Sequence, residues 1–352
     1  MKIKALILAG GSGTRFWPKS TKEKPKQFLK ITSDKTMIQE TFDRISKLVK
    51  AENIFVVSNK NHSNHVHEQL NLPKENVILE PNAKNTAAAI ALGILNMNDE
   101  DVVIALPSDH YIKDVDTYIK ILKIAVDFSS KNDAIVTLGI KPNKPETGYG
   151  YIEVDKTNET VIGGLTRNLD SHDVSSTDAD KTVVENDKTV SEVGESVIPN
   201  LIRNLIPLKV KRFHEKPNLE TAYQYLESGN FFWNSGMFIF KVSTMWKAFK
   251  KHMPALYKAF KSVKTNEEMA TIYSSLESIS MDYGVMERAD NIYVIPSDFG
   301  WSDVGSWDAL YKLAKKDKNG NYAQGKVIFR DATPIILPNR EALIYFFYSL
   351  SS

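Results

Sequence analysis

Short apolar runs alternate with amphipathic stretches through the first half of the chain. The apolar runs predict buried β-strands at Ala5–Ala9, Ile54–Ser58, Val77–Leu79, Val102–Leu106 and Ala134–Leu138. Apolar residues at helical spacing predict helices at Met37–Val49, Thr86–Leu95 and, farther along, Leu219–Ser228. This alternation predicts an α/β fold with a Rossmann-like, mixed but mostly parallel sheet flanked by helices. Ligands of such sheets bind beyond the carboxyl ends of the strands, so the residues that follow each strand are candidates for function.

The pattern changes between Val154 and Leu208. No aromatic residue occurs between Tyr151 and Phe213, although the chain is 10% aromatic, and Asp, Ser and Thr are frequent there. A segment of this composition buries little apolar surface. We therefore predict one large domain at 1–325 that carries a solvated, low-complexity insertion at about 155–208.

Composition narrows the class of protein. The chain has 352 residues, of which 42% are hydrophobic and 25% charged, as in ordinary globular enzymes. A formal charge of +2 argues against a protein whose main partner is nucleic acid. The absence of cysteine excludes disulfides and thiolate metal sites. No apolar run approaches the roughly 20 residues of a membrane span. The expectation is a cytoplasmic protein without a nucleic-acid or membrane partner.

The first predicted strand is followed by a glycine-rich stretch with basic residues. Gly10, Gly11 and Gly13 leave the backbone bare, so that amide groups there can approach an anion closely. Arg15 supplies a planar fork of donors and Lys26 a compact positive charge, and both suit phosphate oxygens. The stretch is therefore a candidate phosphate-binding loop.

The spacing fits neither of the two common phosphate-binding motifs. A P-loop requires Gly-Lys-Ser/Thr at its end, where this chain has Gly13-Thr14-Arg15. A dinucleotide fingerprint requires a further glycine near Phe16. On the motif alone, a tight structural turn is an equally good interpretation.

Two aspartates are candidates for metal binding. Asp109 lies in the segment LPSDH that follows the strand at Val102–Leu106, and Asp303 lies in the segment GWSDVGSW. Carboxylates at such positions suit Mg²⁺, which takes one or two of them together with substrate phosphate oxygens. The alternative at each is a turn or helix-capping aspartate. Whether the two side chains meet is left open by the sequence.

Asn85 and Thr86 begin an alanine-rich helical stretch. The expected role of Asn85 is to cap this helix, and a helix N-terminus can also bind a polar or anionic ligand. His62, His65 and His67 lie close together, but without suitably spaced carboxylates we interpret them as a solvated helix face rather than a metal site.

Eight segments occur in order along the chain, and they are LILAGGSGTRFWPKS with PKQFL, EPNAKNTAAAIAL, LPSDHYI, TLGIKPNKPETGYGYIE, RFHEKP, FFWNSGMFIF, MDYGVMER and FGWSDVGSWDAL. This ordered series resembles the bacterial mannose-1-phosphate guanylyltransferases, or GDP-mannose pyrophosphorylases, of the sugar nucleotidyltransferase superfamily. The resemblance covers most of residues 1–325 outside the insertion. It implies the nucleotide-diphospho-sugar transferase fold.

The resemblance also implies a reaction and a site. In that family, the phosphate of α-D-mannose 1-phosphate attacks the α-phosphorus of GTP in line, with Mg²⁺, and gives GDP-mannose and pyrophosphate. The nucleophile is already an anion, so catalysis is positioning and charge neutralisation. By the resemblance, Arg15, Lys26 and Lys216 would be catalytic, and Asp109 and Asp303 would hold Mg²⁺. The substrate-binding residues would be Gly10, Gly11, Gly13, Glu80, Asn85, Thr86, Gly148, Glu215 and Asn234.

The chain departs from the family pattern in two places. The insertion at about 155–208 replaces a short connection. At the C-terminus, NYAQGKVIFRDA resembles the first strand of the family's left-handed β-helix, but the sequence that follows does not continue the pattern. We expect 326–352 to be a truncated or replaced β segment, which would weaken a homodimer that uses it.

Two alternatives to the leading interpretation stay open. A related nucleotidyltransferase with another sugar or base would keep the same motifs, because a few pocket residues set that choice. A weakly active or regulatory GTP-binding homologue would keep the fold and the nucleotide site but release little pyrophosphate.

Overall fold

The computed structural model describes residues 1–11, 13–155, 205–263, 265–316, 318, 321–323 and 336–337. Nearly all of the predicted insertion at 155–208 and of the C-terminal segment 326–352 lies outside these residues. The predictions made for those two segments therefore stay predictions. No helix in the described ranges is long and apolar enough to cross a membrane.

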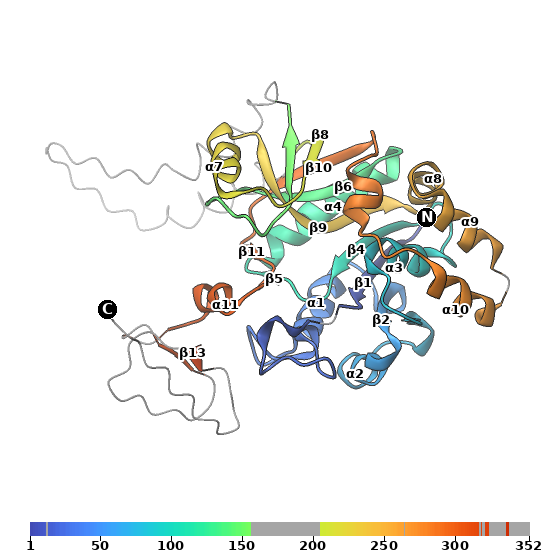
Figure 1. The fold of residues 1–352 in the computed structure, drawn as a ribbon, viewed down its shortest axis with the longest axis horizontal. Helices are drawn as coiled ribbons and strands as arrows, with labels where there is room; N and C mark the ends of the chain where they lie inside the picture. The colour runs from blue at the N-terminus through green and yellow to red at the C-terminus, as the bar shows by residue number, and fades with distance from the viewer. Residues whose placement is uncertain are drawn as a thin grey trace, which may run out of the picture.

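Nine strands of the described residues form one sheet in the order β3-β2-β1-β4-β9-β6-β10-β8-β7 (Figure 1). Their bounds are β1 Ile3–Ala9, β2 Ile54–Asn59, β3 Val77–Glu80, β4 Val102–Pro107, β6 Ile135–Ile140, β7 Tyr151–Val154, β8 Leu208–His214, β9 Phe231–Lys241 and β10 Ile292–Ser297. β1, β2, β3 and β4 pair in parallel, as do β6 and β10. β8 and β9 run against their neighbours. The predicted mixed, mostly parallel sheet is confirmed.

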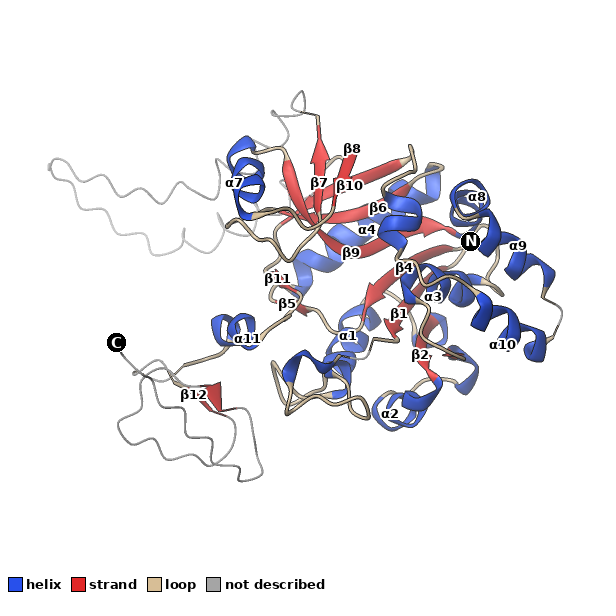
Figure 2. Cartoon of the chain, in the orientation of Figure 1, coloured by secondary structure: helices blue, strands red, loops and turns tan. Residues whose placement is uncertain are grey.

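Helices cover both faces of this sheet (Figure 2). One face is packed by α1 (Met37–Ser46), α2 (Ser63–Gln69), α4 (Val115–Lys131) and α7 (Leu219–Ser228). The other is packed by α3 (Asn85–Ile94), α8 (Val242–His252), α9 (Pro254–Ser262) and α10 (Asn266–Ser275). A last helix, α11 (Trp307–Leu313), contributes to a separate small cluster.

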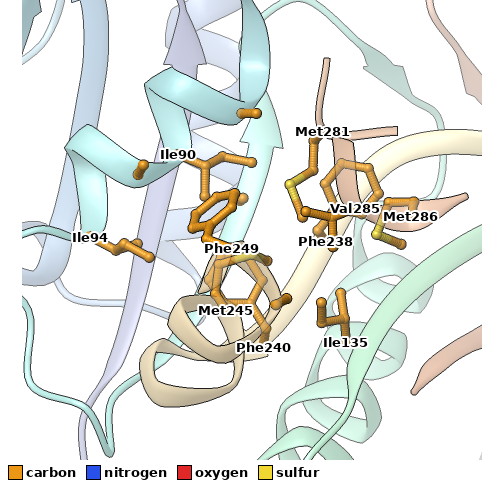
Figure 3. Close-up of a cluster of buried hydrophobic side chains, with 14 of the residues drawn as sticks. Ile90, Ile94, Ile135, Phe238, Phe240, Met245, Phe249, Met281, Val285 and Met286 are labelled. Carbon is orange, nitrogen blue, oxygen red and sulfur yellow. The ribbon is translucent and has the colours of Figure 1, made fainter. Parts of the chain in front are cut away.

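Alternation along β1 explains the two cores. Leu6 belongs to the core beneath α3 and α8, whereas its neighbours Ala5 and Ile7 belong to the core beneath α1 and α4. Successive side chains of a strand point to opposite faces, so a strand buried on both faces becomes a continuous apolar run. Figure 3 shows the first of these cores, where Ile90 of α3 and Phe249 of α8 pack together.

The predicted elements agree with the observed ones, apart from their ends. The strand predicted at Ala5–Ala9 begins at Ile3, and the helix predicted to reach Val49 ends at Ser46. α1 begins with a capping box in which the Thr36 hydroxyl accepts from the Gln39 amide and the Gln39 side chain accepts from the Thr36 amide.

Five short elements lie near the carboxyl ends of the strands or among the last described residues. β5 (Tyr111–Ile112) pairs antiparallel with β11 (Trp301–Ser302), which brings the segments after β4 and β10 together. A single π-helical turn, η7, spans Asp282–Met286. β12 (Tyr322–Ala323) pairs in parallel with β13 (Ile336–Leu337).

Candidate active site

The carboxyl ends of β1 and β4 lie side by side and carry two of the predicted site segments. Leu8 pairs with Pro107 in the parallel ladder, and the Ser108 amide donates to the Leu8 carbonyl at 3.1 Å. The glycine stretch after β1 and the turn that bears Asp109 after β4 therefore begin next to each other, as expected from their positions in neighbouring parallel strands.

Lys26 and Gln27 form hydrogen bonds to the backbone of the glycine stretch. Gly13 has a φ of 48°, and a Cβ there would lie 2.6 Å from the Lys26 backbone nitrogen, so the position requires glycine. The Lys26 amide donates to the Gly13 carbonyl at 3.2 Å. The Gln27 side chain donates to the carbonyls of Ala9 and Gly11, each at 3.0 Å. These hydrogen bonds fix the conformation of the loop backbone.

Lys26 is buried at the centre of the site, with 3% of its surface exposed. Its ammonium donates to the Asp109 carboxylate at 2.9 Å, to the Asp109 backbone carbonyl at 2.9 Å and to the Asp303 backbone carbonyl at 2.5 Å. Three hydrogen bonds use all of its donors. One cation therefore joins the turns that bear the two predicted metal-binding aspartates.

The Asp303 carboxylate faces the same space. Its Oδ1 accepts from the Tyr149 hydroxyl at 2.8 Å and from the Gly305 amide at 3.1 Å. Its Oδ2 lies 3.9 Å from the Arg15 guanidinium, whose side chain is 72% exposed. Arg15 is thus free enough to reach an anionic ligand, whereas the Asp303 carboxylate is held in one orientation.

Charge and burial set the protonation of the groups around Asp109. Burial raises the pKa of Asp109, but the charge and hydrogen bond of Lys26 together with the charges of His110 and Arg15 outweigh it, so that the pKa lies below its usual value. Burial lowers the pKa of His110 to about 4 against the opposing effect of Asp109. The imidazole is therefore neutral near pH 7, and its Nδ1 accepts from the Trp301 indole at 3.1 Å.

The carboxylates of Asp109 and Asp303 fit the chemistry of a Mg²⁺ site. Among the described residues, no group of three or more His, Cys, Asp or Glu side chains could hold a metal ion by itself. Mg²⁺ commonly uses one or two carboxylates and completes its shell with water and substrate phosphates. Asp109 and Asp303, on two turns that Lys26 joins beside a glycine loop, match that mode better than an all-protein metal cage.

The residues predicted for the nucleotide side lie beyond the glycine loop. A Cβ at Gly10 would clash with Glu80 Oε2, so Glu80 packs directly against the loop. Its Oε1 accepts from the Tyr273 hydroxyl at 2.5 Å. Burial raises the pKa of Glu80, an effect that the Tyr273 hydrogen bond offsets in part.

The expected capping role of Asn85 is wrong in its detail. Asn85 is itself the first residue of α3, with a φ of 65°, and its side chain accepts from the adjacent Thr86 amide at 2.8 Å. The Thr86 hydroxyl accepts from the Met281 amide at 2.7 Å. The start of α3 is therefore fixed by the segment before η7 and not by a side-chain cap.

The residues predicted for the sugar side form a second group. The Asn234 amide donates to the Gly150 carbonyl at 2.8 Å, and a Cβ at Gly150 would lie 3.3 Å from Glu215 Oε2. Lys216 pairs with Glu215. The Gly148 amide donates to Glu146 Oε1 at 3.1 Å. Tyr149, from the same loop, links this group to Asp303.

The interpretation of the histidines as a solvated helix face is wrong for His62, whereas His65 is partly exposed and His67 is exposed. His62 is buried, and its Nε2 donates to the Lys22 carbonyl at 2.9 Å. His65 Nε2 donates to the Glu23 carbonyl at 2.9 Å, and its ring packs on Phe28. These contacts hold the stretch of chain just before Lys26 against the segment that bears the two histidines.

A family model described as nucleotidyl transferase matches residues 4–163 and 197–320. This chain belongs to the nucleotidyl transferase family. The matched residues include both turns joined by Lys26, the glycine loop and both groups of predicted substrate-binding residues.

Curated relatives and solved structures are similar along most of this nucleotidyl transferase. The mannose-1-phosphate guanylyltransferase of Escherichia coli is 34% identical over 339 residues, which cover 92% of this chain and 64% of the relative. The alginate biosynthesis protein AlgA of Pseudomonas syringae pv. tomato is 33% identical over 96% of this chain and 64% of its own length. The chain thus spans just under two thirds of the relatives that it matches. A crystal structure from Thermus thermophilus, described as a mannose-1-phosphate geranyltransferase, superposes with a TM-score of 0.73 at 26% identity, covering 96% of this chain and 90% of that one.

Several residues of the nucleotidyl transferase site were missed by sequence reasoning. They are Gln27, His110, Tyr149, Tyr273 and Asp282, each of which contacts a predicted site residue or lies directly beside one. Gln27, His110, Tyr149 and Asp282 had a signal, since they lie inside the segments PKQFL, LPSDHYI, TLGIKPNKPETGYGYIE and MDYGVMER that carry the family resemblance. Tyr273 had none, because its contact with Glu80 joins positions 193 apart.

Proposed function

We propose that this nucleotidyl transferase moves GMP from GTP to α-D-mannose 1-phosphate and releases pyrophosphate. The observation that carries the proposal is the meeting of Asp109 and Asp303 at one buried ammonium, beside a glycine loop at the end of β1. The choice of GTP and mannose 1-phosphate is supported by relatives named mannose-1-phosphate guanylyltransferase at 34–35% identity.

The proposed reaction requires no nucleophile from the protein. A phosphate oxygen of the sugar 1-phosphate forms a bond to the α-phosphorus of GTP, and the bond from that phosphorus to the bridging oxygen of pyrophosphate breaks. Negative charge moves from the attacking oxygen to the leaving pyrophosphate. The protein contributes orientation and positive charge, which are the main sources of catalysis in phosphoryl and nucleotidyl transfer.

The charged and polar groups of the site would have different roles in this reaction. The amides of Gly10, Gly11 and Gly13 and the exposed Arg15 would hold the triphosphate. Lys26 would keep the two aspartate-bearing turns together, and its positive charge would stabilise the negative charge of the reacting phosphates. Bound Mg²⁺ would supply further neutralisation of phosphate charge, with Asp109 and Asp303 as its protein ligands.

The two groups beside this centre would receive the two substrates. Glu80, Asn85 and Thr86 lie on the α3 side of the glycine loop and would face the base and ribose of GTP. The sugar phosphate would bind on the opposite side, at Gly148, Glu215, Lys216 and Asn234. Tyr149 supports this division, because it belongs to the sugar-side loop and reaches Asp303.

A pyrophosphate-release assay tests the proposal. Native protein with GTP, Mg²⁺ and mannose 1-phosphate is expected to release pyrophosphate, and Asp109→Ala to release far less. Other nucleoside triphosphates and glucose 1-phosphate are run in parallel. Faster turnover with another base or sugar would favour the related nucleotidyltransferase, and GTP binding without pyrophosphate from any sugar phosphate would favour a regulatory homologue. The cytoplasmic location and the weakened homodimer stay predictions of the sequence.

A further inference from the structure

The segment that runs from α10 to η7 is fixed to the nucleotide side of the site. The Thr86 hydroxyl accepts from the Met281 amide at 2.7 Å, and the Ala87 amide donates to the Ile279 carbonyl at 3.3 Å. Met281 is also fully buried against the core under α3 and α8 (Figure 3). The first residue of η7, Asp282, therefore occupies a well-defined place next to the site.

Asp282 contacts the sugar-side group through Asn234. Asn234 Nδ2 donates to Asp282 Oδ1 at 2.6 Å, and Asn234 Oδ1 accepts from the Gly236 amide at 3.1 Å. These two contacts fix which way the carboxamide points, since its oxygen and one of its N–H groups are both used. The second N–H of Asn234 has no acceptor in the described part of the chain and can donate to a ligand.

The Asp282 carboxylate is a partly buried anion with spare accepting capacity. Among the described residues, the Asn234 side chain and the backbone amide of Asp282 itself donate to it, and a carboxylate can accept about four hydrogen bonds. Burial raises the pKa of Asp282 and the charge of Glu215 acts in the same direction, whereas the hydrogen bond from Asn234 and the charge of Lys216 lower it. A buried carboxylate without enough donors is costly, and the hydroxyl groups of a bound sugar ring are donors that would satisfy it.

We propose that Asp282 is a sugar-recognition residue of this site, which orients the Asn234 carboxamide through Oδ1 and accepts a hydrogen bond from a ring hydroxyl of the sugar 1-phosphate. This inference rests on the proposed function for the class of ligand. It adds a residue that none of the sugar-side motifs identifies, since Asp282 approaches from the α10–η7 segment.

The test is the equilibrium binding of mannose 1-phosphate, measured by calorimetry on the full chain. Asp282→Ala is expected to weaken this binding by about 10- to 100-fold, the range for a lost hydrogen bond to a charged group. Asp282→Asn keeps an oxygen that can accept from Asn234 and is expected to lose less. Binding of GTP should be unchanged in both variants, because the backbone of Met281, and not the Asp282 side chain, contacts the nucleotide side. Asp290→Asn, at an exposed aspartate paired with Lys251, is the matched control.

Deoxy analogues make the test specific to the hydroxyl contact. The 2-, 3-, 4- and 6-deoxy forms of mannose 1-phosphate are titrated into native protein and into both variants. For one analogue, the loss seen with native protein should vanish in Asp282→Ala, as expected when the two partners of one hydrogen bond are removed in turn. Losses that add for every analogue, or unchanged sugar affinity in both variants, would overturn the inference, as would native protein that binds no mannose 1-phosphate.

The binding and turnover results separate the two proposals. Native protein that binds mannose 1-phosphate with the Asp282 dependence described, but releases no pyrophosphate from GTP, would refute the proposed reaction and support the role of Asp282. Turnover of GTP and mannose 1-phosphate with a sugar affinity independent of residue 282 would do the reverse.

Discussion

The Lys26 ammonium donates to the backbone carbonyl of Asp303 at 2.5 Å, although 277 positions of the sequence separate the two residues. The same nitrogen holds the turn of Asp109, so one buried cation fixes the distance between two strand ends. In the proposed reaction this arrangement keeps the metal-binding carboxylates in place while the substrates come and go. Such preorganisation is the general way in which a site of this kind accelerates transfer between anions.

Replacing Lys26 with methionine tests this central cation. The variant keeps a long side chain at a buried position but removes the charge and all three hydrogen bonds. We expect kcat for pyrophosphate release to fall by about 10²- to 10³-fold, as is typical when one electrostatic donor is removed. Lys24→Met, at an exposed lysine of the same loop, is the control. A native rate in Lys26→Met would remove Lys26 from the proposed site.

Substitutions at two glycines of the loop distinguish a glycine that the fold requires from a glycine that ligand binding requires. Gly13→Ala places a Cβ 2.6 Å from the Lys26 nitrogen at a φ of 48°, and the left-handed conformation alone costs about 1–2 kcal/mol. We expect a lower melting temperature and a lower rate. At Gly11 a Cβ would meet no atom of the described residues within 4 Å, so Gly11→Ala should leave the melting temperature unchanged. Its Michaelis constant for GTP should rise if phosphates approach the loop. An unchanged constant would argue against phosphate binding there.

Tyr149→Phe removes the hydroxyl that orients Asp303 and keeps the aromatic ring in its contacts with Trp233 and Trp301. We expect the Mg²⁺ concentration for half-maximal rate to rise by about tenfold, since outer partners of metal ligands commonly contribute 10- to 100-fold in affinity. Tyr151→Phe is a matched control, because among the described residues that hydroxyl hydrogen-bonds to the backbone of Glu146 and not to a predicted metal ligand. Equal Mg²⁺ requirements in the two variants would show that Tyr149 does not position a metal ligand.

Glu80 should make stability depend on pH in a defined direction. Burial raises its pKa in the folded protein, so between the unfolded and the folded pKa the folded state binds more protons. Its contribution to stability is therefore present at low pH and is lost as the pH rises through the folded pKa. Glu80→Gln cannot ionise and can still accept from Tyr273. We expect this variant to gain free energy of unfolding relative to native protein as the pH rises from about 4 to about 8.

Urea unfolding at several pH values measures this difference. Glu52→Gln, at an exposed glutamate, is the control for the substitution itself. A free energy of unfolding of Glu80→Gln that falls relative to that of native protein as the pH rises would show that the carboxylate, rather than the acid, is the form preferred in the folded state.

Much of the fold could be predicted from the sequence because burial leaves a local signal. Strands buried on both faces, such as β1 and β4, are continuous apolar runs, and their positions were predicted to within a few residues. The residues after those strands, Gly10 to Gly13 and Asp109, were recognised as candidates because ligands bind at that edge of a parallel sheet. Family resemblance added Lys216 and Asn234, whose local sequence has no chemical signature of its own.

The sequence by itself determined which segments are buried, which strand ends carry glycine, cation and carboxylate, and which family the motifs resemble. Only the tertiary structure decided that Lys26 is a buried bridge, that Tyr149 orients Asp303 and that Asp282 faces Asn234. The physical reason is that periodicity encodes the environment of each residue one element at a time. Contacts between side chains from different strand ends depend on the order of strands in the sheet, and here β9 inserts between β4 and β6 through pairings that no local pattern specifies.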